Sequence, residues 1–168
     1  KTLENDQTFN GLVPQLVYDN AIALVPTSVK FRLKFLKVLE KFPQTEKLQS
    51  HILGSIEKDF TDNVESWVHR ANYKLTLSDA IVCLNEGIEK ITKLNDSSKT
   101  VGIYESYCNW LNNKATDEEL SNSDQILINT NLNSLLTNAT NNSIIYSSIT
   151  LIKSHIWYLV NSNQIESA

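Results

Sequence analysis

Histidine, cysteine and glycine are the residues through which this sequence could catalyse a reaction, bind a metal or hold a phosphate. His51, His69 and His155 fall in separate segments, and no His-x-x-x-His pair occurs. Cys83 and Cys108 form no Cys-x-x-Cys spacing and have no base beside them in the sequence. The 4 glycines are isolated, so the sequence has no glycine-rich phosphate loop. We therefore expect no catalytic residue, no metal site and no cofactor, and we interpret both cysteines as small buried residues of a reducing compartment.

Four lysines are the best candidates for chemistry at the surface. Lys30, Lys34, Lys37 and Lys41 recur at i, i+4, i+7 and i+11, which aligns them along one side of a helix. This lysine ridge could bind RNA phosphates, with release of counterions, or an acidic protein. The alternative is a solvated ridge that only keeps the helix soluble, which is the commoner role of charged runs. The net charge of −4 at pH 7 argues against a surface that is basic throughout.

Four aromatic residues form a second candidate for nucleic-acid contact. Trp67, Tyr104, Tyr107 and Trp110 could stack on the bases of a single strand. Aromatic side chains at helical spacing are more often part of a core, and we favour that interpretation here.

The elements that position these residues are predicted to be helices. Only 4 Gly and 3 Pro occur in 168 residues, and 41% of the residues are hydrophobic, enough for a core. Apolar residues at helical spacing predict an all-α fold in a single domain over residues 1–168. The eight predicted helices cover approximately residues 12–25, 29–42, 45–60, 64–75, 79–94, 100–112, 117–136 and 144–160.

Residues suited to capping mark the start of several predicted helices. Thr27 or Ser28 is expected to cap the second helix, and Ser78 or Asp79 the fifth. Residues 116–119, Thr-Asp-Glu-Glu, predict the start of the seventh, because acidic side chains are favourable at the positive end of a helix dipole.

The helix predicted over residues 29–42 has apolar residues on both sides of the lysine ridge. A helix that lies on one core has a single apolar face. This helix is therefore expected to lie between neighbours, as helices do in a solenoid. The residues on one flank are Phe31, Phe35, Val38 and Phe42, and those on the other are Val29, Leu33 and Leu36.

Small residues recur every 33 positions in one helix of each predicted pair. Ala21, Gly54 and Gly87 show this period. A side chain of almost no size lets the paired helix approach the backbone closely. Glycine inside a helix costs about 0.5–1 kcal/mol relative to alanine, so a packing gain is expected to offset that cost.

The other helix of each pair repeats as well. Val29, Val64 and Val101 recur at intervals of 35 and 37 residues, and Ala71 follows Val64 by seven residues. A period in the mid-thirties with two helices per unit is typical of the tetratricopeptide-like class. The repeat therefore predicts a right-handed α-solenoid of antiparallel helical hairpins.

The details of the repeat point to one variant of this class. Tyr18, Ala21 and Pro26 form a Tyr-x-x-Ala element followed by proline, and Trp67 supplies an aromatic residue in the other kind of helix. Over residues 12–94 the sequence resembles the HAT (half-a-tetratricopeptide) repeat family. The resemblance includes the stretches 17–22, 31–36 and 48–60. The sequence departs from the family at Arg32, where an aromatic is usual, and at His51 and Leu84, which replace the tyrosine.

HAT proteins are scaffolds of RNA-processing particles. The resemblance implies a non-catalytic protein–protein interaction scaffold in the small-subunit processome, a nucleolar ribonucleoprotein that processes pre-18S ribosomal RNA during ribosome biogenesis. It implies residence in the nucleus and nucleolus, with other protein subunits as partners. The alternatives are a HAT scaffold of the spliceosome or of mRNA 3′-end processing, and direct RNA binding through the lysine ridge.

The two ends of the sequence add further expectations. Residues 1–8 are polar, without the pattern of a secretory signal, and no apolar run is long enough for a membrane helix. The sequence contains no methionine, and we expect it to be a piece of a longer protein. The last helix is strongly apolar, and it either closes the stack or serves for self-association, as in HAT proteins. Its apolar residues include Ile149, Ile152, Ile156, Trp157 and Leu159.

Overall fold

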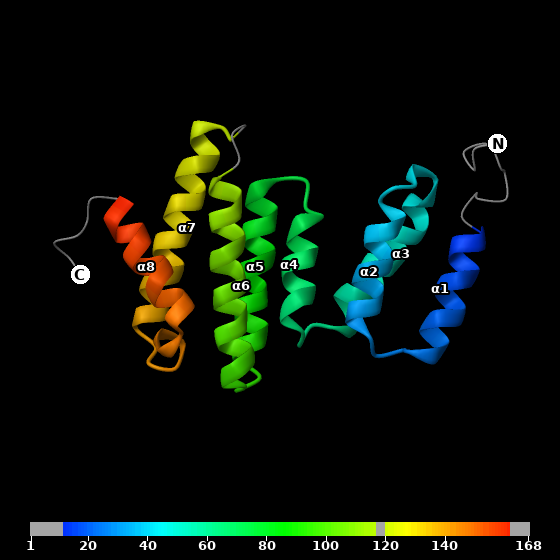
Figure 1. Cartoon of the computed structure of the whole chain (residues 1–168), viewed down its shortest axis with the longest axis horizontal. Helices are drawn as coiled ribbons and strands as arrows, with labels where there is room; N and C mark the ends of the chain where they lie inside the picture. Colours follow the sequence, from blue (N-terminus) through cyan, green and yellow to red (C-terminus); the bar gives the residue numbers. More distant parts are fainter. Residues whose placement is uncertain (1–11, 117–119, 162–168) are drawn as a thin grey trace. The chain divides into compact units, whose positions relative to one another are not determined.

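Helices make up almost all of the described structure. The computed structural model of the chain describes residues 12–116 and 120–161, and these residues form eight α-helices, two short 3-10 helices and no strand (Figure 1). The predicted all-α class is confirmed, and each predicted helix has a counterpart. Contacts within the chain divide it into two compact units, Lys1–Phe60 and Thr61–Ala168, where the sequence predicted one domain.

Unit 1 is built around the pairing of two helices. α2 and α3 pack against each other through Leu36, Ile52 and Ile56, whose side chains are completely buried. α1 joins this core through Tyr18, whose ring lies 5.4 Å from that of Phe35. The elements of unit 1 are α1 (Leu12–Leu24), α2 (Val29–Leu39), η3 (Pro43–Thr45) and α3 (Glu46–Asp59).

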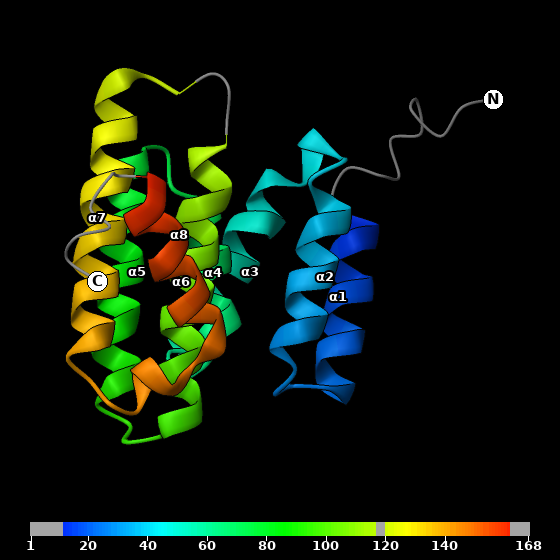
Figure 2. The same cartoon turned by 60° about the vertical axis from the view of Figure 1, so that its left-hand side comes forward.

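Unit 2 is a series of helices in which each pair packs against the next. α4 packs against α5 and α6, and α6 packs in turn against α5, α7 and α8 (Figure 2). A continuous core runs through the unit, with Leu84, Leu111 and Leu136 almost fully buried in it. The elements of unit 2 are α4 (Val64–Asn72), α5 (Leu77–Thr92), α6 (Ser97–Ala115), α7 (Asn122–Thr140), η4 (Ile145–Ser147) and α8 (Ile149–Asn161).

Side-chain caps explain where several helices begin. Ser28 caps α2 by accepting a hydrogen bond from the backbone N–H of Phe31, as predicted. The predicted cap of α5 is wrong: Thr76, not Ser78 or Asp79, accepts the N–H of Asp79. The Thr76 hydroxyl also donates to the Asp79 carboxylate at 2.7 Å, so the two side chains form a reciprocal pair at the helix start.

The predicted start of the seventh helix is also wrong. Thr116 lies at the C-terminal end of α6, which extends to Ala115, and residues 117–119 fall outside the described ranges. The cap of α7 is Ser121, which accepts the N–H of Asp124 at 3.1 Å and donates its hydroxyl to the Asp124 carboxylate. The helix predicted over residues 117–136 is therefore observed as α7, Asn122–Thr140.

The last helix begins later than predicted. Residues 145–147 form the 3-10 helix η4, so α8 starts at Ile149 instead of position 144. Ser148 precedes it, and its hydroxyl accepts the N–H of Leu151 and donates to the Glu105 carboxylate on α6. This buried serine therefore fixes the start of α8 against α6.

The capping of α7 leads to a test by substitution. Ser121→Ala removes the acceptor for the Asp124 N–H, and we expect the free energy of unfolding to fall by about 1 kcal/mol, the usual cost of losing such a cap. Thr116→Ala is the matched control, because Thr116 is exposed and only donates to the carbonyl of Asn113. Urea denaturation measures both. A larger loss for Thr116→Ala than for Ser121→Ala would contradict the assignment.

Candidate functional site

Three lysines of the ridge, Lys30, Lys34 and Lys37, lie on the exposed side of α2. The fourth, Lys41, lies in the turn that follows, because α2 ends at Leu39 and not at the predicted position 42. Lys30, Lys34, Lys37 and Lys41 are all exposed, and none of them forms an ion pair within the part of the chain that the structure describes. The opposite side of the helix is buried through Val29, Arg32, Leu36 and Leu39. The structure therefore places three of the four lysines on one exposed helix surface, as predicted, and the fourth just beyond the end of that helix.

The predicted burial of α2 on both flanks holds at most positions but fails at Val38. Leu36 is completely buried, and Phe31, Leu33 and Phe35 are half-buried. Val38 is 53% exposed. It follows Lys34 by four residues, so it lies beside the ridge on the helix surface.

The ridge opposes the stability of its own helix. Lys34 has like-charged neighbours three and four residues away, and each such pair costs an isolated helix about 0.2–0.5 kcal/mol. The first turn of α2 contains no acidic residue, so Lys30 faces the positive end of the helix dipole without compensation. If every second lysine of the ridge were replaced by an acidic residue, the helix would remain equally soluble and would gain favourable charge pairs.

Arg32 is not part of this surface. Its side chain is 5% exposed, its Nη1 donates to the carbonyl oxygen of Pro26 at 2.8 Å, and its guanidinium lies 4.7 Å from the centre of the Phe60 ring. The cation therefore ties the turn before α2 to the start of that helix. Pro26 itself is exposed, and it follows the end of α1 as the sequence predicted.

Trp67 makes the corresponding contact in unit 2. Its side chain is 2% exposed, and its indole N–H donates to the carbonyl oxygen of Thr61 at 2.9 Å. Arg32 and Trp67 are each the fourth residue of their helix, and each donates to the carbonyl six positions earlier. The sequence marked Arg32 as a departure from the repeat, but in geometry it performs the role that Trp67 performs.

Val101 was predicted to occupy the same position in its helix as Val29 and Val64, and this prediction is wrong by about one helical turn. Val29 and Val64 are the first residues of their helices, whereas Val101 is the fifth residue of α6. The reason is the cap: the Asp96 carboxylate accepts the N–H of Lys99, so α6 begins at Ser97. The residue in the position of Arg32 and Trp67 is Thr100, which is buried.

The small residues that recur every 33 positions do not share one packing role. Gly87 is buried, and a Cβ added there would lie 2.8 Å from Cγ of Trp67, so the predicted close approach is confirmed. Gly54 is exposed, and a Cβ there would have nothing within 4 Å, so the prediction is wrong at this position. Ala21 is half-buried. Ala71, in contrast, is 1% exposed in the core of unit 2.

The indole of Trp67 also contacts Arg70 of the same helix. The guanidinium carbon of Arg70 lies 4.0 Å from the centre of the ring. Trp67 thus combines a hydrogen bond, a cation–π contact and close packing on the backbone of α5.

The other aromatic candidates belong mainly to the core, as the sequence analysis favoured. Tyr107 and Trp110 are buried and Tyr104 is half-buried. Burial raises the pKa of the Tyr104 and Tyr107 hydroxyls. The indole N–H of Trp110 donates to the Asn72 side chain at 2.8 Å, which joins α6 to α4.

The three histidines have different surroundings. His51 is exposed, His155 is half-buried, and the ring of His69 lies 5.0 Å from that of Tyr73. Both cysteines are free and buried, as predicted. Burial raises the pKa of the Cys108 thiol. Within the described ranges, no three His, Cys, Asp or Glu side chains come close enough to hold a metal ion.

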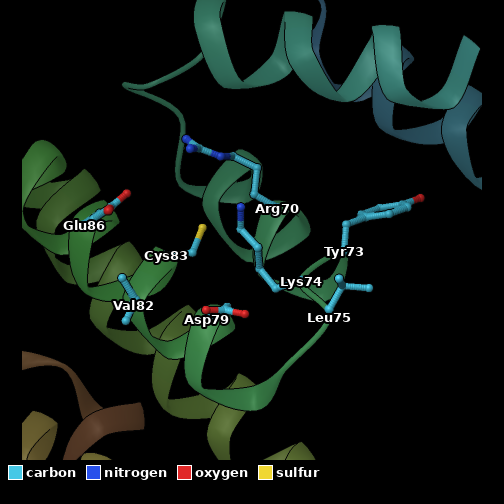
Figure 3. Close-up of a pocket in the computed structure, with 8 residues that line it drawn as sticks. All are labelled: Arg70, Tyr73, Lys74, Leu75, Asp79, Val82, Cys83 and Glu86. Atoms are coloured by element: carbon cyan, nitrogen blue, oxygen red, sulfur yellow. The ribbon is translucent and has the colours of Figure 1, made fainter. Parts of the chain in front are cut away.

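One hollow of about 360 Å³ lies between α4 and α5 (Figure 3). Arg70 and Lys74 line it from the α4 side, and Asp79, Cys83 and Glu86 from the α5 side. The Asp79 carboxylate already accepts the Thr76 hydroxyl. The lining therefore combines two cations with two carboxylates around a buried thiol.

The last helix buries one side and exposes the other. Leu151 is buried in the core of unit 2, and Ile152 and Leu159 are half-buried. Ile149 and Ile156 are 70% and 56% exposed, and Trp157 is also exposed. α8 packs against α6 and α7 on its buried side.

Comparisons with protein-family models, with curated proteins and with solved structures give no match to this chain. The likeness to HAT repeats therefore stays a prediction from the sequence. Among the described helices, none is both long enough and apolar enough to cross a membrane.

The two glycines of the repeat are expected to respond oppositely to the same substitution. Gly87→Ala places a Cβ against the buried indole of Trp67, and overpacking of this kind costs about 1–3 kcal/mol. Gly54→Ala meets no neighbour and removes the helix penalty of glycine, so it should stabilise the fold by about 0.5–1 kcal/mol.

Urea denaturation of the wild type and both variants tests this difference. Each variant serves as the control for the other, because the chemical change is identical. Equal stabilisation by both alanines would show that Gly87 and Trp67 are not in close contact.

Proposed function

We propose that this chain is a non-catalytic scaffold, a right-handed α-solenoid of antiparallel helical hairpins that holds other proteins. The observation that carries the proposal is the matching contact at Arg32 and Trp67. The two residues are 35 positions apart and lie in different units, yet each side chain ties the start of its helix to the preceding turn in the same way. Such a recurrence is expected if one structural unit has been repeated along the chain.

The packing within unit 2 supports the same proposal. α4 pairs with α5, and α6 pairs with α7. The second pair packs against the first because α6 contacts both α4 and α5. Trp110 reinforces this contact with its hydrogen bond from α6 to Asn72 at the end of α4. Successive pairs that bury a continuous core against each other are the building principle of a solenoid.

The exposed surfaces suit a protein that binds other proteins. In addition to the lysine ridge, large apolar side chains are exposed on α1 and on α8. Leu24 and Ile149 are 84% and 70% exposed. Exposed apolar patches commonly mark interaction surfaces.

The assembly that we propose is a nucleolar ribonucleoprotein that processes pre-18S ribosomal RNA. Support for this part comes from the HAT-like residues Tyr18, Ala21, Pro26 and Trp67. HAT scaffolds of the spliceosome and of mRNA 3′-end processing are the related alternatives.

Affinity purification of the full-length protein from its own cells tests the proposal. We expect co-purification of several protein subunits together with small nucleolar RNA and pre-18S ribosomal RNA. Gly87→Leu, which should displace Trp67 and disrupt helix packing, is expected to lose these partners. Recovery of splicing, 3′-end-processing or cytosolic complexes, without a nucleolar ribonucleoprotein, would contradict the assignment.

A further inference from the structure

We infer that the lysine ridge and Val38 together form a docking strip for an acidic amphipathic helix of a partner protein. The inference rests on the proposed scaffold function and names the chemistry of one partner. The docking strip consists of Lys30, Lys34, Lys37, Val38 and Lys41, all of which are exposed.

The charges of the docking strip are free to bind a negative partner. No acidic side chain within the described residues forms an ion pair with any of the four lysines. The lysines also repel one another along α2, and none is needed to hold the helix in unit 1, whose core lies on its other side. A surface that weakens its own helix is expected where binding requires it.

The positive charge is local to this part of the chain. The protein has 15 basic and 19 acidic residues, and its net charge is −4. A nucleic-acid partner would be repelled by much of the remaining surface. A short acidic segment of a protein contacts only the strip and avoids that repulsion.

The apolar residues beside the lysines favour a protein over RNA. Val38 offers an apolar contact that phosphate groups cannot use. Phe31 and Phe35 could stack on bases only with free ring faces, but their rings lie 5.7 Å apart and pack with Tyr18 in the unit 1 core. The strip therefore resembles half of a small protein interface, with an apolar centre and a charged rim.

The spacing of the lysines fits a partner helix. From Lys30 to Lys37 the strip covers two turns of α2, about 10 Å at the helical rise, and Lys41 lies in the turn that follows the helix. Carboxylates at i, i+4 and i+7 of a second helix follow the same period. An apolar residue between them would pack on Val38, because helices in contact lie about 8–10 Å apart.

Site-specific photo-cross-linking in cells tests the inference on the full-length protein. Val38 is replaced by a photoreactive amino acid, and the adduct is identified by mass spectrometry. We expect an adduct with an acidic helical segment of a protein. The combined change Lys34→Glu and Lys41→Glu should reduce its yield at least tenfold, and the carboxylate at position 34 lies between Lys30 and Lys37, which favours α2.

The same photoreactive residue at Leu75 is the matched control. Leu75 is completely exposed in unit 2, so its adducts should not respond to the charge changes on α2. An RNA adduct at position 38, an adduct with a non-acidic segment, a yield that ignores the charge changes or the absence of any adduct would each overturn the inference. Recovery of the proposed subunits in the same purification, without the acidic adduct, would refute the docking strip alone. Loss of both would refute the scaffold as well.

Discussion

The contact of the Trp67 indole with the backbone of α5 at Gly87 is the constraint on which unit 2 depends. A side chain of any size at Gly87 would occupy the space of the indole. The same indole donates to the Thr61 carbonyl in the turn before α4, and Asn72 at the end of α4 receives the Trp110 N–H from α6. One close approach thus connects three helices. Arg32 performs the same task at the turn before α2 with a guanidinium in place of an indole.

Arg32 holds the turn before α2 and Trp67 the turn before α4, and within unit 2 the pair α4 and α5 is buried against the pair α6 and α7. Because these turn contacts and buried cores hold the helices together, the residues on the exposed faces of the helices are not needed for folding. The lysine ridge, the apolar side of α8 and the hollow between α4 and α5 are all on such faces. The proposed scaffold function would require this separation between the residues that hold the fold and those on the exposed faces.

The sequence predicted the eight helices and the exposed lysines, because helical periodicity depends on which residues are apolar. It did not predict contacts between distant residues, nor which of several neighbouring residues caps a helix. Gly54 and Gly87 are the same residue at the same period, yet only Gly87 has an aromatic neighbour across the helix pair. Thr76 and Ser121 cap their helices, and their hydroxyls donate to the carboxylates of Asp79 and Asp124 three positions later. Other hydroxyl and acidic residues nearby in the sequence are equally suited to capping, so the sequence alone does not identify the cap. The role of Arg32 was hidden because its chemical type differs from that of Trp67.

Hydrogen exchange of the Trp67 indole N–H, followed by NMR, tests the central contact most directly. The account predicts that this proton exchanges only when the core of unit 2 opens, at a rate similar to that of the most protected amides of α5 and α6. The Gly87→Ala variant should accelerate this exchange. An indole proton that exchanges nearly as fast as in the denatured chain would show that Trp67 is not held between the Thr61 carbonyl and α5, and the structural basis of the repeat would be lost.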